Sequence, residues 1–177
     1  MRRAVFLDRD GTITFAPVID GKPGAPATLA EMRILDGVPE ALASLRAAGY
    51  LLICVTNQPD VARGKQKLEV VEAMHAYLMR TLPLDQIYSC FHDDADNCDC
   101  RKPKPGMFFQ AAREHDIDLQ QSFMVGDRWR DIDAGINAGV RTAFIDYKYP
   151  EKQPASCDVR VKSFAEAARW ILTSAQQ

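Results

Sequence analysis

Two aspartates stand two residues apart at the end of a short apolar run near the beginning of the chain. The run at residues 4–7 is followed by Asp8, Arg9, Asp10 and Gly11. One carboxylate can attack phosphorus while a second carries a proton to the departing oxygen, and glycine permits a tight turn beside a phosphate. The spacing indicates a phosphoryl-transfer pair, without saying which aspartate attacks. Taken alone, it would also suit an ordinary turn.

Three further segments place polar side chains where a phosphate ester or a divalent cation would need them. They are Thr56 after the apolar run 51–55, Lys102 before the helical pattern that begins at Gly106, and Asp127 and Asp131 after the apolar run 123–125. Positive charge beside a helix N-terminus favours a bound anion. Together with the first segment, these groups offer a nucleophile, a hydroxyl, a cation and a pair of acids suited to a metal.

In this order, the four segments resemble the motifs of the haloacid dehalogenase superfamily of phosphatases. The combination of DRDGTI, TNQ with ARG, CxH with CDCRKP, and PGM is similar to two neighbouring branches, the heptose bisphosphate phosphatases and the histidinol phosphatases. Of these two branches, the motifs resemble the heptose bisphosphate phosphatases more. The resemblance then implies removal of the 7-phosphate of D-glycero-D-manno-heptose 1,7-bisphosphate, with histidinol phosphate or another small sugar phosphate as the alternative.

The resemblance also implies a mechanism, which is Mg²⁺-dependent hydrolysis of a phosphomonoester through an aspartyl-phosphate. It makes Asp8 the nucleophile and Asp10 the proton shuttle, with Thr56 and Lys102 holding the phosphate oxygens. Mg²⁺ prefers oxygen ligands in octahedral geometry. The groups expected around it are Asp8, the backbone carbonyl of Asp10, Asp127, and Asp131 through a bound water.

A cluster of soft and borderline metal ligands lies just before Lys102. Its members are Cys90, His92, Cys98 and Cys100, within 11 residues. Four such ligands can complete a closed tetrahedral zinc site, which would be structural. Free cysteines beside an incidental histidine are the alternative on spacing alone. The resemblance favours zinc, because this subfamily carries a Cys, His, Cys, Cys loop immediately before its Arg-Lys-Pro motif.

Five polar or basic residues are candidates to bind the substrate. They are Asn57, Arg63, Arg101, Lys104 and Arg128. Arginine offers two-pronged geometry to a phosphate, and Arg63 argues against the cationic histidinol phosphate. Asp60 argues the other way, because Pro59-Asp60 stands where the heptose branch usually shows Ser-Gly. On the alternative interpretation, Arg63 merely pairs with Asp60 on the loop surface.

The composition predicts one compact domain over residues 1–177. The chain is 47% hydrophobic and 26% charged, with a net charge of −2, so it offers no general attraction to nucleic acid or to an anionic membrane. No apolar run approaches the roughly 20 residues of a membrane span. We expect a cytoplasmic monomer whose partner is a small phosphorylated sugar.

Strand and helix patterns alternate along the chain, which predicts a doubly wound, Rossmann-like α/β fold with helices on both faces of a parallel sheet. Strands are expected at 4–7, 50–55, 86–89, 122–125, 142–145 and 158–161, and helices at 36–48, 67–81, 106–115, 130–138 and 164–173. About 46 residues separate Asp10 from Thr56, and about 46 separate Thr56 from Lys102. Neither interval can hold a cap domain, so loops 15–33, 58–67 and 90–100 should roof the site.

Two other classes of protein are weaker hypotheses. A phosphotransfer or phosphate-sensing module without turnover would be expected to lack one of the acids, yet Asp8, Asp10, Lys102 and Asp127 are all present. A nucleic-acid binder built on the zinc loop would need a basic face. His75 and His115 lie in helical stretches away from the motifs and are assigned structural or solvated roles, whereas Trp129 either borders the site or packs in the core.

Overall fold

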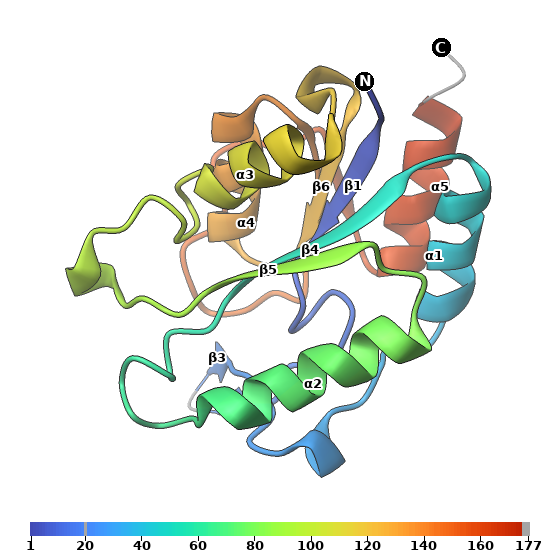
Figure 1. Cartoon of the computed structure of the whole chain (residues 1–177). Helices are drawn as coiled ribbons and strands as arrows, with labels where there is room; N and C mark the ends of the chain where they lie inside the picture. Colours follow the sequence, from blue (N-terminus) through green and yellow to red (C-terminus); the bar gives the residue numbers. More distant parts are fainter. Residues whose placement is uncertain (20, 175–177) are drawn as a thin grey trace.

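The computed structural model describes residues 1–19 and 21–174, and a central parallel sheet of six strands organises them (Figure 1). The strand order is β5-β4-β1-β6-β7-β8. The strands are β1 (Ala4–Leu7), β4 (Leu51–Asn57), β5 (Gln86–Cys90), β6 (Phe123–Gly126), β7 (Arg141–Ile145) and β8 (Val159–Val161). Three of the inner strands, β1, β4 and β6, are buried almost throughout. They read as continuous apolar runs because a parallel sheet covered on both faces has no solvent side.

Helices cover both faces of the sheet, as predicted. On one face α1 (Val38–Ala47) packs against α5 (Phe164–Ser174), joined by the C-terminal part of α2 (Leu68–Thr81). On the other face lie α3 (Gly106–His115) and α4 (Trp129–Ala138). Two separate hydrophobic clusters result, one on each side of the sheet. Helices α1, α3, α4 and α5 turn their apolar stripes to the sheet, as the 3.6-residue periodicity indicated, whereas α2 joins the core mainly through Leu78.

The start of α1 corrects one local prediction. The helix predicted at 36–48 has Asp36 as its first, N-cap residue, but the N-cap in the structure is Gly37, with φ of 78° and no side-chain cap. A residue in this left-handed region needs the freedom of glycine, so the chain turns into the helix one residue later than expected. Pro39 sits in the first turn, where its missing N–H costs nothing.

The segment between β1 and α1 contains only small elements. It forms a two-stranded hairpin, β2 (Val18–Ile19) with β3 (Lys22–Pro23), and a 3-10 turn at Leu29–Glu31. The hairpin was not predicted, because two-residue strands carry no readable alternation. Within residues 1–19 and 21–174 this interval adds no cap domain, which agrees with the predicted capless fold. No helix in the described part of the chain is long and apolar enough to cross a membrane.

The order of the inner strands decides where a site can form. From β1 the chain first adds β4 and β5 on one side, and later adds β6, β7 and β8 on the other. Leu7 is paired with Cys54 of β4 and with Val125 of β6, so the carboxyl ends of all three strands meet. Ligands of doubly wound folds bind at such a switch point. Asp8, Thr56 and Asp127 stand there.

Candidate active site

A buried ammonium joins two of the predicted carboxylates. The Lys102 Nζ atom lies 2.7 Å from Asp8 Oδ1 and 2.7 Å from Asp131 Oδ1, and it donates to the Val55 carbonyl at 2.7 Å. Lys102 is 1% exposed. Burial by itself lowers the pKa of this lysine, but the Asp131 and Asp8 carboxylates outweigh it and raise the pKa above the usual range. The lysine is therefore a fixed positive charge at the centre of the site.

Asp127 completes a group of three buried carboxylates. One oxygen from each of Asp8, Asp127 and Asp131 lies within 4.8 Å of the others. The Tyr149 hydroxyl lies beside Asp127 but outside normal hydrogen-bond geometry, and neither Asp127 oxygen has a hydrogen-bond partner among the described residues. Burial, and then the Asp131 and Asp8 charges, raise the pKa of Asp127 well above its usual value. Burial likewise raises the pKa of Asp8 to about 7, against the opposing effect of Lys102.

These three carboxylates face one ammonium, so the group carries more negative than positive charge. A buried oxygen without a donor is costly in a folded protein. A hard divalent cation such as Mg²⁺ would supply both the missing charge and a partner for Asp127. The donor set fits the metal predicted from the sequence.

Gly11 allows the backbone after Asp10 to lie against the Asp127 carboxylate. A Cβ atom at this position would stand 2.0 Å from Asp127 Oδ2, and Gly11 has φ of 90°. Only glycine satisfies both the close approach and the positive φ. The predicted Mg²⁺ ligation by the Asp10 carbonyl stays a prediction.

The Asp10 side chain is held by three other residues. Arg9 donates to it through Nε at 3.1 Å and Nη2 at 2.8 Å. Gln58 Nε2 donates to Asp10 Oδ2 at 3.0 Å, and Thr14 Oγ1 lies 3.1 Å from Oδ1. Sequence reasoning missed Arg9 and Gln58 as functional residues. The one sequence feature that could have identified them is their position, because Arg9 stands between the two aspartates and Gln58 ends the Thr-Asn-Gln segment.

The carboxyl end of β4 supplies two polar side chains that make different contacts. Thr56 is 1% exposed and accepts a hydrogen bond from Gln58 Nε2 at 2.9 Å. Asn57 exchanges two hydrogen bonds with the backbone of Lys102, from Nδ2 to the carbonyl and from the Lys102 N–H to Oδ1, both at 3.1 Å. Asn57 was predicted to bind substrate, and it also fixes the segment that carries the lysine.

A cleft of about 160 Å³ opens above these groups. Its floor includes Asp8, Asp10 and Thr56, and its walls include Pro23 to Ala25 from the hairpin. Two of the loops expected to roof the site, 15–33 and 58–67, do line it. The third predicted loop, 90–100, contributes no residue to the lining.

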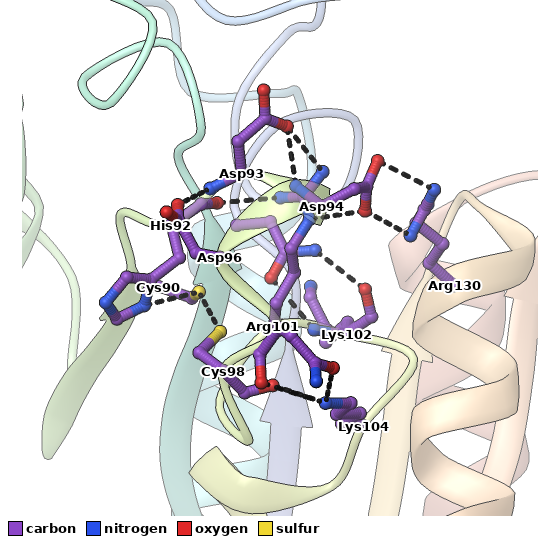
Figure 2. Close-up of polar contacts among 12 residues, drawn as sticks. Cys90, His92, Asp93, Asp94, Asp96, Cys98, Arg101, Lys102, Lys104 and Arg130 are labelled. Carbon is purple, nitrogen blue, oxygen red and sulfur yellow. Dashed lines mark hydrogen bonds and ion pairs between the residues drawn. The ribbon is translucent and has the colours of Figure 1, made fainter.

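Three arginines also line this cleft, namely Arg63, Arg128 and Arg130. Each is already paired with an acid. Arg63 donates Nε and Nη2 to the two oxygens of Asp93 at 2.8 and 2.6 Å, and Arg128 pairs with Glu151. Arg130 lies 3.2 Å from Asp94 (Figure 2). Arg128 was predicted but Arg130 was not, because its position in the sequence does not show that the first turn of α4 brings it to the cleft as well.

The acids on the loop after β5 connect these arginines to the cysteine cluster. Asp93 is the N-cap residue of a 3-10 turn (Asp94–Asp96), and Figure 2 shows Asp94 between the cysteines and Arg130. The predicted ion pair of Arg63 with Asp60 is longer, at 3.4 Å, and is therefore weaker than the pair of Arg63 with Asp93. The Arg63 guanidinium holds the pKa of Asp93 down to about 2. Loop 90–100 therefore acts on the cleft indirectly, through ion pairs.

Arg101 and Lys104, which were predicted to bind substrate, do not line the cleft that contains Asp8. Arg101 donates Nε to Asp94 at 2.8 Å, and Lys104 donates Nζ to the Cys98 carbonyl at 2.7 Å. Both line a neighbouring hollow against loop 90–100. Of the predicted substrate-binding residues, Asn57, Arg63 and Arg128 border the cleft that contains Asp8.

The four predicted zinc ligands converge in space. The Sγ atoms of Cys90 and Cys98 are 3.6 Å apart, and those of Cys98 and Cys100 are 3.5 Å apart. His92 Nδ1 lies 3.3 Å from the Cys100 sulfur. Zinc with bonds of about 2.3 Å to sulfur and tetrahedral angles separates its ligands by roughly 3.5 to 3.8 Å. The cluster fits such an ion, and Figure 2 shows Cys90, His92 and Cys98 turned toward one another.

The two helical histidines and Trp129 lie in three different surroundings. His115 accepts or donates a hydrogen bond with the Tyr88 hydroxyl at 3.1 Å, far from the cleft. His75 is not remote from the motifs, since its Nε2 lies 3.1 Å from Arg9 Nη1. Helix α2 brings it there, which its sequence position could not reveal. The Trp129 ring makes cation–π contacts with Arg130 and Lys152, and Trp129 does not line the cleft.

Comparison with known proteins agrees with this arrangement. The sequence profile of the haloacid dehalogenase-like hydrolases matches residues 27–139. The D-glycero-beta-D-manno-heptose-1,7-bisphosphate 7-phosphatase of Helicobacter pylori strain 26695 is 38% identical over 93% of this chain and 94% of its own length. The Pasteurella multocida protein with the same activity in its name is 43% identical over 82% of each chain.

A solved structure gives the same result in three dimensions. The D,D-heptose 1,7-bisphosphate phosphatase of B. bronchiseptica, complexed with magnesium and phosphate, superposes with a TM-score of 0.83 at 30% identity. The match covers 97% of this chain and 99% of the other. These comparisons confirm the resemblance that the motifs indicated, including its heptose branch.

Proposed function

The chain belongs to the haloacid dehalogenase-like hydrolases, and from that premise we propose that it is a Mg²⁺-dependent phosphatase acting through an aspartyl-phosphate on a sugar bisphosphate. The proposed substrate is D-glycero-D-manno-heptose 1,7-bisphosphate, and the phosphate removed is the one at position 7. One observation carries the proposal. A buried cluster of three carboxylates and one lysine opens into a cleft bordered by three arginines.

The cleft offers a different set of groups to each phosphate of a doubly phosphorylated substrate. The carboxylate cluster and Lys102 suit the phosphate that reacts, because a metal and an ammonium can neutralise it there. The arginines suit the phosphate that is retained, because guanidinium groups bind phosphate with two parallel hydrogen bonds. The relatives named above support the choice of a heptose bisphosphate, since that substrate is in their names.

The reaction begins with the substrate held between fixed charges. Asp8, Asp127 and the Asp10 carbonyl would hold Mg²⁺, with Asp131 orienting a bound water, and the ion when bound neutralises phosphate charge. Lys102 and the Thr56 hydroxyl would contact the equatorial oxygens of the phosphoryl group. Lys102 is kept in place by Val55 and by the Asn57 contacts to its backbone. These groups are in position before substrate arrives, which is what electrostatic catalysis requires.

Two displacements then complete the turnover. A carboxylate oxygen of Asp8 attacks phosphorus in line, the bond from phosphorus to the sugar oxygen breaks, and Asp10 gives that oxygen its proton. Asp10 next takes a proton from a water molecule as the water attacks the phosphorus of the aspartyl-phosphate. The second step frees inorganic phosphate and restores Asp8. Asp10 is suited to the shuttle because Arg9, Gln58 and Thr14 fix its carboxylate.

A phosphate-release screen tests the proposed function. Purified protein with Mg²⁺ should release phosphate from heptose 1,7-bisphosphate with a higher kcat/KM than from hexose bisphosphates, simple esters or histidinol phosphate, and EDTA should abolish the release. Mass spectrometry of the product should find the phosphate retained at position 1. Absence of release from every ester in the presence of Mg²⁺ would refute the phosphatase.

One observation favours histidinol phosphate as a second candidate. The Asp60 carboxylate lines the cleft beside Arg63, and a carboxylate there would attract the cationic amine of histidinol phosphate and repel a second phosphate. The same screen decides between the two. A higher kcat/KM for histidinol phosphate than for any bisphosphate would assign that activity instead.

Replacing Arg63 should separate the retained phosphate from the reacting one. Arg63→Ala is expected to lower kcat/KM for the bisphosphate by about 10- to 150-fold, the effect of one charge-assisted contact of about 1.5 to 3 kcal/mol. A simple monophosphate ester should lose little, because Asp8, Asp10 and Lys102 remain intact. Steady-state kinetics on the two substrates measures the difference.

Asp93 provides the matched control for Arg63. It occupies the Nε and Nη2 edge of that guanidinium in the structure, so Asp93→Asn should weaken the competing ion pair and lower KM for the bisphosphate. Equal losses on both substrates in Arg63→Ala would assign Arg63 to the loop surface and return histidinol phosphate to consideration.

The cysteine cluster should hold one zinc ion per chain. Four ligands already within 4.8 Å of one another lose little freedom on binding, and structural zinc of this type contributes directly to folding. Protein purified without chelator should contain one zinc by plasma mass spectrometry. Cys98→Ser should lower that content, whereas Cys157→Ser, at a cysteine outside the cluster, should not. Zinc-free protein with four freely alkylated side chains would contradict the prediction.

A further inference from the structure

We propose that His75 is a positioning residue for the reaction, holding Arg9 and through it the carboxylate of Asp10. The inference rests on the proposed function, because it concerns the proton shuttle of that reaction. His75 lies on α2, 65 residues beyond Asp10 in the sequence, and no motif includes it.

Arg9 is an unusual link because its side chain is wholly buried. A buried charge is tolerated only when it is paired and its donors are used. Asp10 supplies the counter-charge, accepting from Nε at 3.1 Å and from Nη2 at 2.8 Å. This two-pronged contact fixes the plane of the carboxylate as well as its position.

The remaining edge of the guanidinium is directed at His75. Arg9 Nη1 lies 3.1 Å from His75 Nε2. Arginine has no acceptor and stays protonated, so the histidine nitrogen must be the acceptor, which makes the ring neutral with its proton on Nδ1. Burial, and then the Arg9 charge, lower the pKa of His75 to about 4, in agreement with that assignment. The ring is therefore a fixed acceptor at neutral pH.

Helix α2 holds the ring against Arg9. Its buried face consists of Val71, Met74 and Leu78, and His75 follows Met74 on the edge of that face. If the acceptor were lost, a buried N–H of Arg9 would lack a partner, and the guanidinium would turn or admit water to satisfy it. Gln58 and Thr14 would still contact Asp10. We therefore expect the Asp10 carboxylate to be displaced from its reactive position while it stays within the site.

The leaving group reveals whether Asp10 is misplaced. A sugar alkoxide needs a proton as it departs, whereas p-nitrophenolate is stable without one, so only the first reaction depends strongly on a general acid. His75→Met should lower kcat/KM for the sugar phosphate by about tenfold or more while changing the p-nitrophenyl phosphate value much less. KM should be little affected, because His75 does not line the cleft.

His75→Gln is the rescue variant, because glutamine matches methionine in length and flexibility but carries an acceptor oxygen. It should restore most of the sugar-phosphate rate. His115→Met is the control, since His115 is a half-buried histidine of α3 that contacts Tyr88 of β5, and it should leave both rates unchanged. Equal losses on the two substrates in His75→Met, or a glutamine variant no better than methionine, would overturn the inference.

Ring ¹⁵N NMR of the wild-type protein needs no variant and guards against a methionine variant that fails to fold. We expect a neutral His75 ring with the proton on Nδ1, and a protonated Nε2 would overturn the inference. Wild-type protein that hydrolyses neither ester would refute the proposed function and this inference with it. Active wild-type protein with equal losses in His75→Met would refute the positioning role alone.

Discussion

Asp8→Asn should fold normally and lose at least about a thousandfold in kcat, equivalent to roughly 4 kcal/mol of activation free energy. The reason is chemical, because an amide cannot form the aspartyl-phosphate and nothing else at the strand ends stands in its place. The neighbouring carboxylates Asp127 and Asp131 are directed at the cation site and at Lys102. Phosphate release under saturating substrate and Mg²⁺ measures the loss.

The thermal stability of Asp8→Asn shows whether its lower turnover comes from the missing nucleophile or from a damaged fold. In Asp8→Asn one of three buried carboxylates that share a single ammonium becomes neutral, while Lys102 keeps its contact with Asp131 at 2.7 Å. The thermal midpoint of the metal-free variant should therefore equal or exceed that of the wild type. A variant that unfolds early would show that the Asp8 contact is structural.

Asp146 supplies a matched control for Asp8. It follows β7 at the same edge of the sheet, its side chain is 4% exposed, and it pairs with Lys148 and Arg160. Asp146→Asn should retain nearly full turnover. Near wild-type kcat in Asp8→Asn, or a similar loss in both variants, would refute Asp8 as the nucleophile.

The sequence was sufficient to predict the sheet and the polar residues that meet at its carboxyl edge, because both depend on local patterns. Buried parallel strands are continuous apolar runs, so residues 4–7 and 51–55 were recognisable as strands. The carboxyl end of each run is then the place for functional residues. This is why Asp8, Thr56 and Asp127 could be assigned to one site although 119 residues separate the first from the last.

The contacts around the cleft could not be predicted, because they depend on where loops and helices cross. Arg63 meets Asp93 across 30 residues and Arg9 meets His75 across 66. Arg101 and Lys104 have the charge expected for phosphate binding, yet loop 90–100 draws both away from the cleft. A basic side chain in a motif suggests a bound anion, but here Arg101 pairs with an aspartate and Lys104 donates to neutral oxygens of Asn97 and Cys98.

Lys102→Met should have the largest effect on stability. The substitution nearly preserves side-chain volume but leaves three buried carboxylates without a counter-charge among their neighbours in the cluster. Removing one partner of a buried ion pair costs about 3 to 5 kcal/mol, and for a chain of this size each kcal/mol lowers the thermal midpoint by about 2 to 4 °C. We therefore expect a fall of roughly 6 to 20 °C in the metal-free protein, measured by differential scanning calorimetry in EDTA.

Mg²⁺ should recover part of that loss, because it binds the folded site and supplies positive charge where the ammonium stood. The increase in thermal midpoint on adding Mg²⁺ should therefore be larger for Lys102→Met than for the wild type. Turnover should stay low, because the contact of Lys102 with the phosphate is missing. Lys148→Met is the control, since Lys148 also pairs with a strand-end aspartate, Asp146, but is 80% exposed. An exposed pair contributes about 0 to 1 kcal/mol. Similar midpoints for the two lysine variants would contradict a buried, charge-balancing Lys102.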